Sequence, residues 1–178
     1  MIENEATITL KVRKFGVSVI DTMIGVWKFN RARTLGTLDV IAGLADSSAA
    51  LGWRPSDGRA PIAWQLMHIG ITEELFATER MKGESPEWPD LVVRFKGGST
   101  PDDNVPQVDQ VREVLDQSRS HLIEATSQLS ETDLQTIPEG FRERGWTLGT
   151  MLQVIAWHES HHQGQAHITL NIFKASQA

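Results

Sequence analysis

The stretch WHESHHQGQAH, residues 157–167, contains the residues of this chain best suited to metal chemistry. His158, Glu159 and His162 satisfy the pattern H-E-x-x-H. In metalloproteases with this pattern, two histidines one helical turn apart bind zinc and the glutamate acts as general base. The pattern alone does not decide between a protease, another kind of metal site and a helix that contains several histidines by coincidence.

A protease site needs a third metal ligand beyond the second histidine, and the sequence downstream does not supply it. No Asp or Glu follows His162. In the longer pattern H-E-x-x-H-x-x-G-x-x-H, the final glycine and histidine would each fall one residue later than Gly164 and His167 do. The sequence therefore disfavours a zincin-type metalloprotease and directs the search for a third ligand upstream.

Helical geometry gives these side chains different directions. At 3.6 residues per turn, His162 lies about 40° from His158, and both fall within the apolar stripe of the helix. Gln165 lies on the same face, one turn beyond His162, where it could hydrogen-bond a bound ligand. Glu159 lies about 100° to the side, and we expect a solvated side chain, with a hydrogen bond to an imidazole as the alternative.

The third ligand is sought on another helix, because metal sites in helical bundles are assembled from facing helices. His68 is the only histidine of the second predicted helix, on a mixed face with Gln65 and Thr72 that suits the wall of a cleft. The alternative is a histidine in the helix interior that is hydrogen-bonded to a neighbour. Of the remaining histidines, His161 is expected at the edge of the stripe and His167 in solvent or at a subunit contact. We expect His121 at the surface or in a supporting position.

Periodic apolar residues predict the elements that position these side chains. Four helices are expected, at about residues 18–46, 61–82, 106–129 and 147–174. The segment between the second and third helices contains several prolines and glycines, which indicates a long crossover. Only residues 7–12 and 91–95 look like strands, and both are too isolated for a sheet. We predict an all-α fold, a four-helix bundle with long crossover connections, as a single domain over residues 1–178.

Composition narrows the class of function. The chain has 178 residues, a net charge of −6, and no cysteine or tyrosine. An acidic chain is poorly suited to nucleic acid, and no apolar run is long enough to cross a membrane. Without cysteine, a metal must be bound by His, Asp or Glu, and any thiol must come from a ligand. The first residues carry glutamates rather than the apolar run of a secretory signal, so we expect a cytoplasmic protein.

With His68, His158 and His162 in place, the chain resembles the DinB/YfiT-like family. The segments IAWQLMHIG (62–70) and GWTLGTMLQVIAWHESHHQGQ (145–165) carry the resemblance. They pair one histidine on the second helix with H-x-x-x-H on the last helix, and HHQGQ is similar to the H-x-G-Q ending common in the family. Helix order and loop positions also match, so the resemblance spans most of the chain.

The resemblance implies a four-helix bundle, often a homodimer, that binds one divalent metal, typically zinc or nickel, through these three histidines. Some relatives are thiol-dependent, among them mycothiol-dependent isomerases and transferases and bacillithiol transferases. A DinB-like chain of this kind is expected to be a metal-dependent enzyme, a transferase using a low-molecular-weight thiol cosubstrate or a hydrolase, acting on a small molecule.

Three imidazoles leave a coordination position open, which is the arrangement of catalytic rather than structural zinc sites. A metal-bound water or a thiolate would then be the reacting group. Arg142 and Arg144, just before the last helix, could hold an anionic substrate, although surface charge is the simpler explanation for each of them. The alternative function is a non-catalytic metal-binding or stress-associated bundle protein, whose histidines only hold the helices together.

Overall fold

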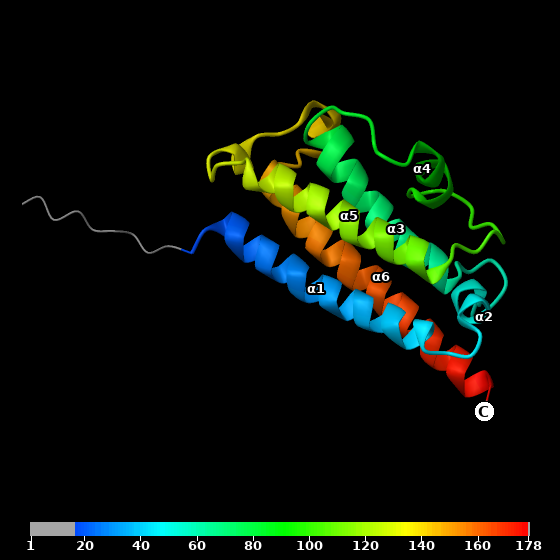
Figure 1. Cartoon of the computed structure of the whole chain (residues 1–178). Helices are drawn as coiled ribbons and strands as arrows, with labels where there is room; N and C mark the ends of the chain where they lie inside the picture. Colours follow the sequence, from blue (N-terminus) through cyan, green and yellow to red (C-terminus); the bar gives the residue numbers. More distant parts are fainter. Residues whose placement is uncertain (1–16, 178) are drawn as a thin grey trace, which may run out of the picture.

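The computed structural model describes residues 17–177, and all regular structure within that range is helical (Figure 1). The predicted all-α class is therefore confirmed. The helices are α1 (Val19–Ala42), α2 (Ser47–Gly52), α3 (Ile62–Leu75), α4 (Pro89–Phe95), α5 (Val108–Ser127) and α6 (Leu148–Ser176). Short irregular helices are η1 (Phe76–Arg80), η2 (Asp133–Gln135) and η3 (Glu139–Arg144).

The long helices α1, α3, α5 and α6 correspond to the segments with apolar periodicity. They form a bundle in which α1 contacts α5 and α6, and α3 contacts the same two helices. Figure 1 shows α1 and α6 side by side, with α5 and α3 above them in this view. The shorter helices lie in the connections, so the predicted number of four describes only the long elements. No helix of residues 17–177 combines the length and apolarity required to span a bilayer.

Side-chain caps fix the starts of the first and last helices. The Ser18 hydroxyl accepts a hydrogen bond from the backbone N–H of Asp21 at 3.3 Å, and Thr147 accepts one from Thr150 at 3.1 Å. Such caps satisfy backbone donors that the first turn leaves unpaired. Just upstream of Thr147, Gly145 adopts a left-handed φ of 63°, which glycine reaches without steric cost, and ends η3. The Thr147 cap and the turn at Gly145 thus determine where the helix that carries His158 and His162 begins.

Residues 91–95, which looked like a strand, belong to helix α4. Pro89 occupies its first turn, where a proline costs no hydrogen bond. The more sheltered residues, Leu91, Val92 and Phe95, recur at steps of three and four, whereas Val93 is exposed. That spacing fits a helix better than a strand. The other strand-like stretch, residues 7–12, lies outside the described part of the chain.

The second long helix does not remain α-helical to its predicted end. After Leu75 the chain continues as the π-helix η1, which ends at Arg80. A π-helical turn adds a residue to the ladder and changes the direction of the side chains that follow it; such turns are frequent at functional sites. Arg80 therefore leaves the bundle in a direction that the α-helical periodicity did not predict.

The interior consists of two apolar clusters. The larger one includes Leu38, Leu66, Leu115 and Leu170, and the smaller one includes Trp27, Leu122 and Ile155. Each long helix carries a buried charged residue near the boundary between the two clusters. These residues are Arg31, Glu73, Arg119 and Glu159. A charged layer therefore divides the apolar core at the level of His158.

Candidate metal centre

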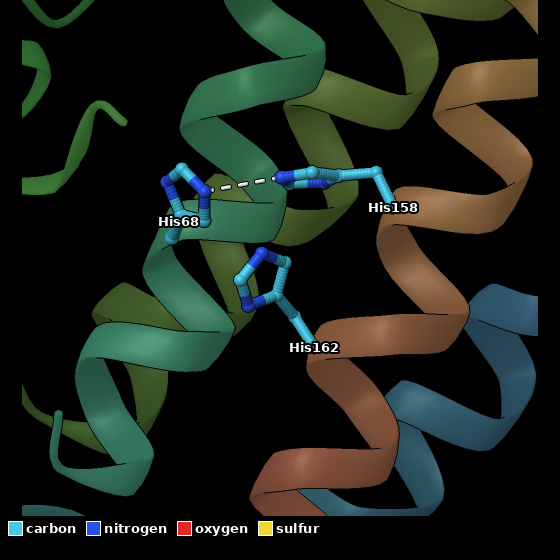
Figure 2. Close-up of side chains that lie close together, drawn as sticks. All are labelled: His68, His158 and His162. Atoms are coloured by element: carbon cyan, nitrogen blue, oxygen red, sulfur yellow. Dashed lines mark hydrogen bonds between the residues drawn. The ribbon is translucent and has the colours of Figure 1, made fainter. Parts of the chain in front are cut away.

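His68, His158 and His162 converge between α3 and α6. One nitrogen of each ring lies within 4.8 Å of the other two, and no other group of three possible ligands is found in residues 17–177. The Nε2 atoms of His68 and His158 are 3.0 Å apart, although 90 positions separate these residues in sequence. Figure 2 shows His68 on α3 facing the two rings on α6. Two nitrogens bound to one tetrahedral zinc ion at about 2.0 Å would be about 3.3 Å apart, so this spacing fits a shared metal.

Hydrogen bonds determine which nitrogen is free on two of the rings. Nδ1–H of His68 donates to the carbonyl oxygen of Phe95 at 2.6 Å, and Nδ1–H of His162 donates to Oε1 of Gln65 at 2.5 Å. In each neutral ring the proton then resides on Nδ1, which leaves the Nε2 lone pair available for a metal. Metal-binding histidines characteristically have such an oxygen partner on the other nitrogen.

Burial keeps the three imidazoles neutral, as metal ligands must be. Burial lowers the pKa of His158 to about 3, and the neighbouring His68 and His161 add smaller effects in the same direction. Burial followed by the proximity of His158 lowers the pKa of His162 to about 3 as well. Burial also lowers the pKa of His68, although its bond to Phe95 acts in the opposite direction. Near neutral pH, protons therefore compete weakly with a metal for these nitrogens.

An aromatic side chain supports the His68 ring. Trp64 stacks on it with ring centroids 4.5 Å apart and planes 18° apart. The indole N–H of Trp64 donates to Ser99 Oγ at 3.2 Å, so the tryptophan is itself fixed to the crossover. Stacking on one face and the bond to Phe95 at Nδ1 leave this imidazole little freedom to rotate.

A cavity of about 1040 Å³ reaches the candidate site, and His68 and His158 form part of its wall. The other walls come from α3, η1, the crossover, η3 and the first turns of α6. Its volume suits a small organic molecule. A molecule in this cavity would have direct access to two of the three imidazoles.

The expectation of a solvated Glu159 is wrong. Its side chain is fully buried, and Arg31 Nε and Arg119 Nη2 bind its two carboxylate oxygens at 2.7 and 2.5 Å. The Thr34 hydroxyl donates a further hydrogen bond at 2.9 Å. No bond to an imidazole is formed. Because both oxygens are bound to cations, Glu159 cannot act as the general base that the protease pattern would require.

Glu159 belongs to a closed ring of four buried charges, one from each long helix. Arg31 of α1 and Arg119 of α5 each bind both Glu73 of α3 and Glu159 of α6. The ring is electrically neutral, so it avoids the cost of an unpaired buried charge. We name it the charged ring. Sequence reasoning missed it. The available signal was that Arg31 and Arg119 interrupt the apolar stripes of α1 and α5.

The other candidate residues lie in different surroundings. Gln165 forms an exposed hydrogen bond with Nε2 of His161 at 2.6 Å. His167 is exposed, as expected. His121 binds the buried carboxylate of Glu74 at 2.7 Å and thus supports a different part of the bundle. None of the three hydrogen-bonds His68, His158 or His162.

Arg142 and Arg144 differ in their position relative to the cavity. Both lie in the exposed helix η3, but only Arg144 lines the cavity that reaches His68 and His158. Arg142 is not part of its wall. Of the two weak candidates for an anionic substrate, Arg144 is the one placed to contact a molecule in the cavity.

The comparison with protein families gives one match. The family model of the DinB superfamily matches residues 27–166. The matched range contains the three histidines, their partners Gln65 and Phe95, and all four members of the charged ring. The comparison with curated proteins gives no significant match.

Proposed function

Because the chain belongs to the DinB superfamily, we propose that it binds one divalent metal ion, zinc or nickel, through His68, His158 and His162. The observation that supports this most strongly is the convergence of three neutral imidazoles, two of which have their second nitrogen bound to an oxygen acceptor. Imidazole ligands without thiolates or carboxylates suit zinc and nickel and are unsuited to magnesium or calcium.

The proposed role is that of a metal-dependent enzyme acting on a small molecule, either a thiol-dependent transferase or a hydrolase. A divalent metal ion held there would supply Lewis acidity and an open position for an incoming water or thiol. The protein's own part is to orient the imidazoles through Phe95 and Gln65 and to surround the reactant in the cavity. The chain contains no cysteine, so a reacting thiol would belong to a low-molecular-weight cosubstrate.

The alternative is a non-catalytic metal-binding or stress-associated protein in which the metal only holds the bundle together. Two observations favour the enzyme. The charged ring already connects all four long helices through contacts that need no metal. The imidazoles of His68 and His158 also face a cavity large enough for a reactant, whereas a structural site is usually closed by protein ligands.

Metal analysis of purified variants tests the proposal. We expect about one zinc or nickel ion per chain in the native protein, by analogy with other three-histidine sites. We expect none in His68→Ala, with an unchanged helical circular dichroism spectrum. His167→Ala is the matched control, since this exposed histidine of α6 lies outside the cluster. A screen for thiol transfer and hydrolysis, native against His68→Ala, then tests the activity.

A specific outcome would refute each part of the proposal: the ligand set, the enzymatic role and the location of the reaction. Equal metal content in native protein and His68→Ala would refute the ligand set. Metal removal that unfolds the bundle, with no turnover in the screen, would favour the non-catalytic alternative. Activity that persists unchanged in His68→Ala would show that any reaction takes place elsewhere.

We further propose a cytoplasmic homodimer. Apolar side chains are strongly exposed on the neighbouring helices α1 and α6, such as Phe29 at 67% and Ile168 at 59%. A second copy of the chain would remove them from water. Sedimentation equilibrium should give twice the mass of the chain for the native protein and a monomer for Phe29→Lys. A native monomer would refute the dimer.

A further inference from the structure

The cavity beside the histidines carries positive charge in an acidic protein. Its wall contains four cationic side chains and two carboxylates. They are Arg80, Lys82, Lys96 and Arg144 against Glu79 and Glu139. The whole chain has a net charge of −6. A cleft whose charge opposes that of the rest of the molecule attracts and orients ligands of the opposite sign, here anions.

Arg80 is the most sheltered of these cations. Its guanidinium lies over the ring of Phe76, 4.4 Å from the ring centre, and 5.4 Å from that of Phe141. Burial lowers the pKa of Arg80; the exposed Glu79 acts in the opposite direction, and Arg144 adds to the effect of burial. Within residues 17–177 no carboxylate comes within ion-pair distance of it, whereas Arg31 and Arg119 of the charged ring each form two ion pairs.

Arg144 brings a second guanidinium to the same wall. It lies over the ring of Trp146 at 5.3 Å, and its charge is felt by Arg80. The described residues offer Arg144 no ion pair either. Two neighbouring guanidiniums repel each other unless an anion lies between them, and the planar fork of each one matches the oxygens of a carboxylate or phosphate.

The two arginines and the histidines share one cavity. Arg80 and Arg144 lie in its wall together with His68 and His158. The charge of Arg80 is also one of the causes that lower the pKa of His158, after burial, His68 and His161. A molecule held by the arginines would therefore extend toward the imidazoles. Phe76, Phe141 and Trp146, which lie next to the two guanidiniums, add apolar surface to the same wall.

We propose that Arg80 and Arg144 form an anion subsite, and that the ligand of this cavity is a small molecule with an apolar body and a carboxylate or phosphate group. The inference rests on the proposed function, since it places the other end of the ligand at the histidine cluster. It adds the chemical class of the substrate, and it assigns a role to Arg80, which no sequence pattern singles out.

Calorimetric titration with benzoate, benzamide and inorganic phosphate tests the subsite. We expect benzoate to bind the native protein, and Arg80→Gln and Arg144→Gln each to weaken binding by about tenfold or more, because a charge-assisted hydrogen bond is lost. Arg142→Gln is the matched control: it removes the same charge from the same helix but lies outside the cavity. Benzamide, which has the same body without the charge, should not distinguish the variants. Comparing benzoate with phosphate shows which anion the subsite prefers.

Titrating metal-free and zinc-loaded protein separates this inference from the proposed function. Arginine-dependent benzoate binding in a protein that takes up no metal would refute the metal proposal and support the subsite. Benzoate binding that requires zinc and is unchanged in both arginine variants would place the anion at the metal and overturn the subsite. Failure of the native protein to bind either anion, or equal weakening in Arg142→Gln, would overturn it as well. Should Arg80→Gln fail to fold, Arg144→Gln and Arg80→Lys provide the same comparison.

Discussion

The side-chain oxygen of Gln65 lies 2.5 Å from Nδ1 of His162, and this contact determines which nitrogen of the imidazole is left for a metal. Gln65 is buried on α3, whereas His162 is on α6, so one hydrogen bond connects the two helices that provide the ligands. Gln65 thereby orients one of the three proposed metal ligands without being a ligand itself.

Replacing Gln65 with leucine should weaken metal binding while keeping the three histidines. Loss of an oxygen partner behind a metal-binding histidine typically costs about 10- to 100-fold in affinity. Competition with a chromophoric chelator measures this change. Gln65→Glu, which keeps an acceptor at the same position, should retain most of the affinity, and equal loss in both variants would contradict the role assigned to this oxygen.

Breaking the charged ring should destabilise the bundle strongly. Glu159→Gln leaves two buried arginines with one carboxylate between them, and removal of one partner from a buried ion pair costs about 3 to 5 kcal/mol. Urea unfolding followed by circular dichroism gives the free energy of unfolding. The exposed pair of Asp39 and Arg112 is the control, and Asp39→Asn should cost less than about 1 kcal/mol. Comparable losses in the two variants would refute the structural importance of the ring.

The metal-free protein should lose stability as the pH falls from about 6.5 toward 3. Burial lowers the pKa of His158 and of His162 from 6.5 to about 3 in the folded state, so in this window the unfolded chain binds protons that the folded chain does not. The free energy of unfolding therefore rises with pH across the window and its histidine contribution is complete above 6.5. Urea midpoints measured at several pH values should fall less steeply for His162→Gln than for the native protein. Equal slopes would argue against a buried, neutral His162.

Two glycine substitutions should have effects of opposite sign. A Cβ added to Gly70 would lie 2.8 Å from Val114 Cγ1 and 3.3 Å from the Val114 carbonyl oxygen, so α3 and α5 would have to separate. Gly70→Ala should cost about 1 to 3 kcal/mol, the usual range for overpacking. Gly25 in α1 has no neighbour within 4 Å of the same position, and Gly25→Ala should stabilise the protein by about 0.5 to 1 kcal/mol. Thermal unfolding of both variants tests whether close packing of α3 against α5 is the reason that position 70 requires glycine.

The approach of the three histidines could be predicted because it follows from helical spacing and from the pairing of two helices. His158 and His162 are one turn apart on any α-helix, and the family resemblance selected His68. The direction of Glu159 could not be obtained in the same way. A helical projection assumes one buried face, but α6 packs against both α1 and α3, so the buried arc of α6 is wider. Both the histidines and Glu159 fall inside that arc.

Other features of the structure could not be predicted from the periodicity of apolar residues. The hydrogen-bond partner of His68 is a backbone carbonyl oxygen. Every residue has such an oxygen, so the sequence cannot show which one His68 would bind. The direction of Arg80 depends on the π-helical turn that ends at this residue, which an α-helical projection cannot represent. Residues 91–95 contain β-branched and aromatic residues favoured in strands, yet the chain there is held as a helix after Pro89.

The carbonyl of Phe95 has a consequence for protein engineering. It belongs to the last residue of α4, inside the connection between α3 and α5. Transplanting the three imidazoles onto another scaffold would copy the ligands but leave this oxygen behind. A faithful graft would have to carry the connecting segment as well, and a change in its length would alter the metal affinity without altering any ligand.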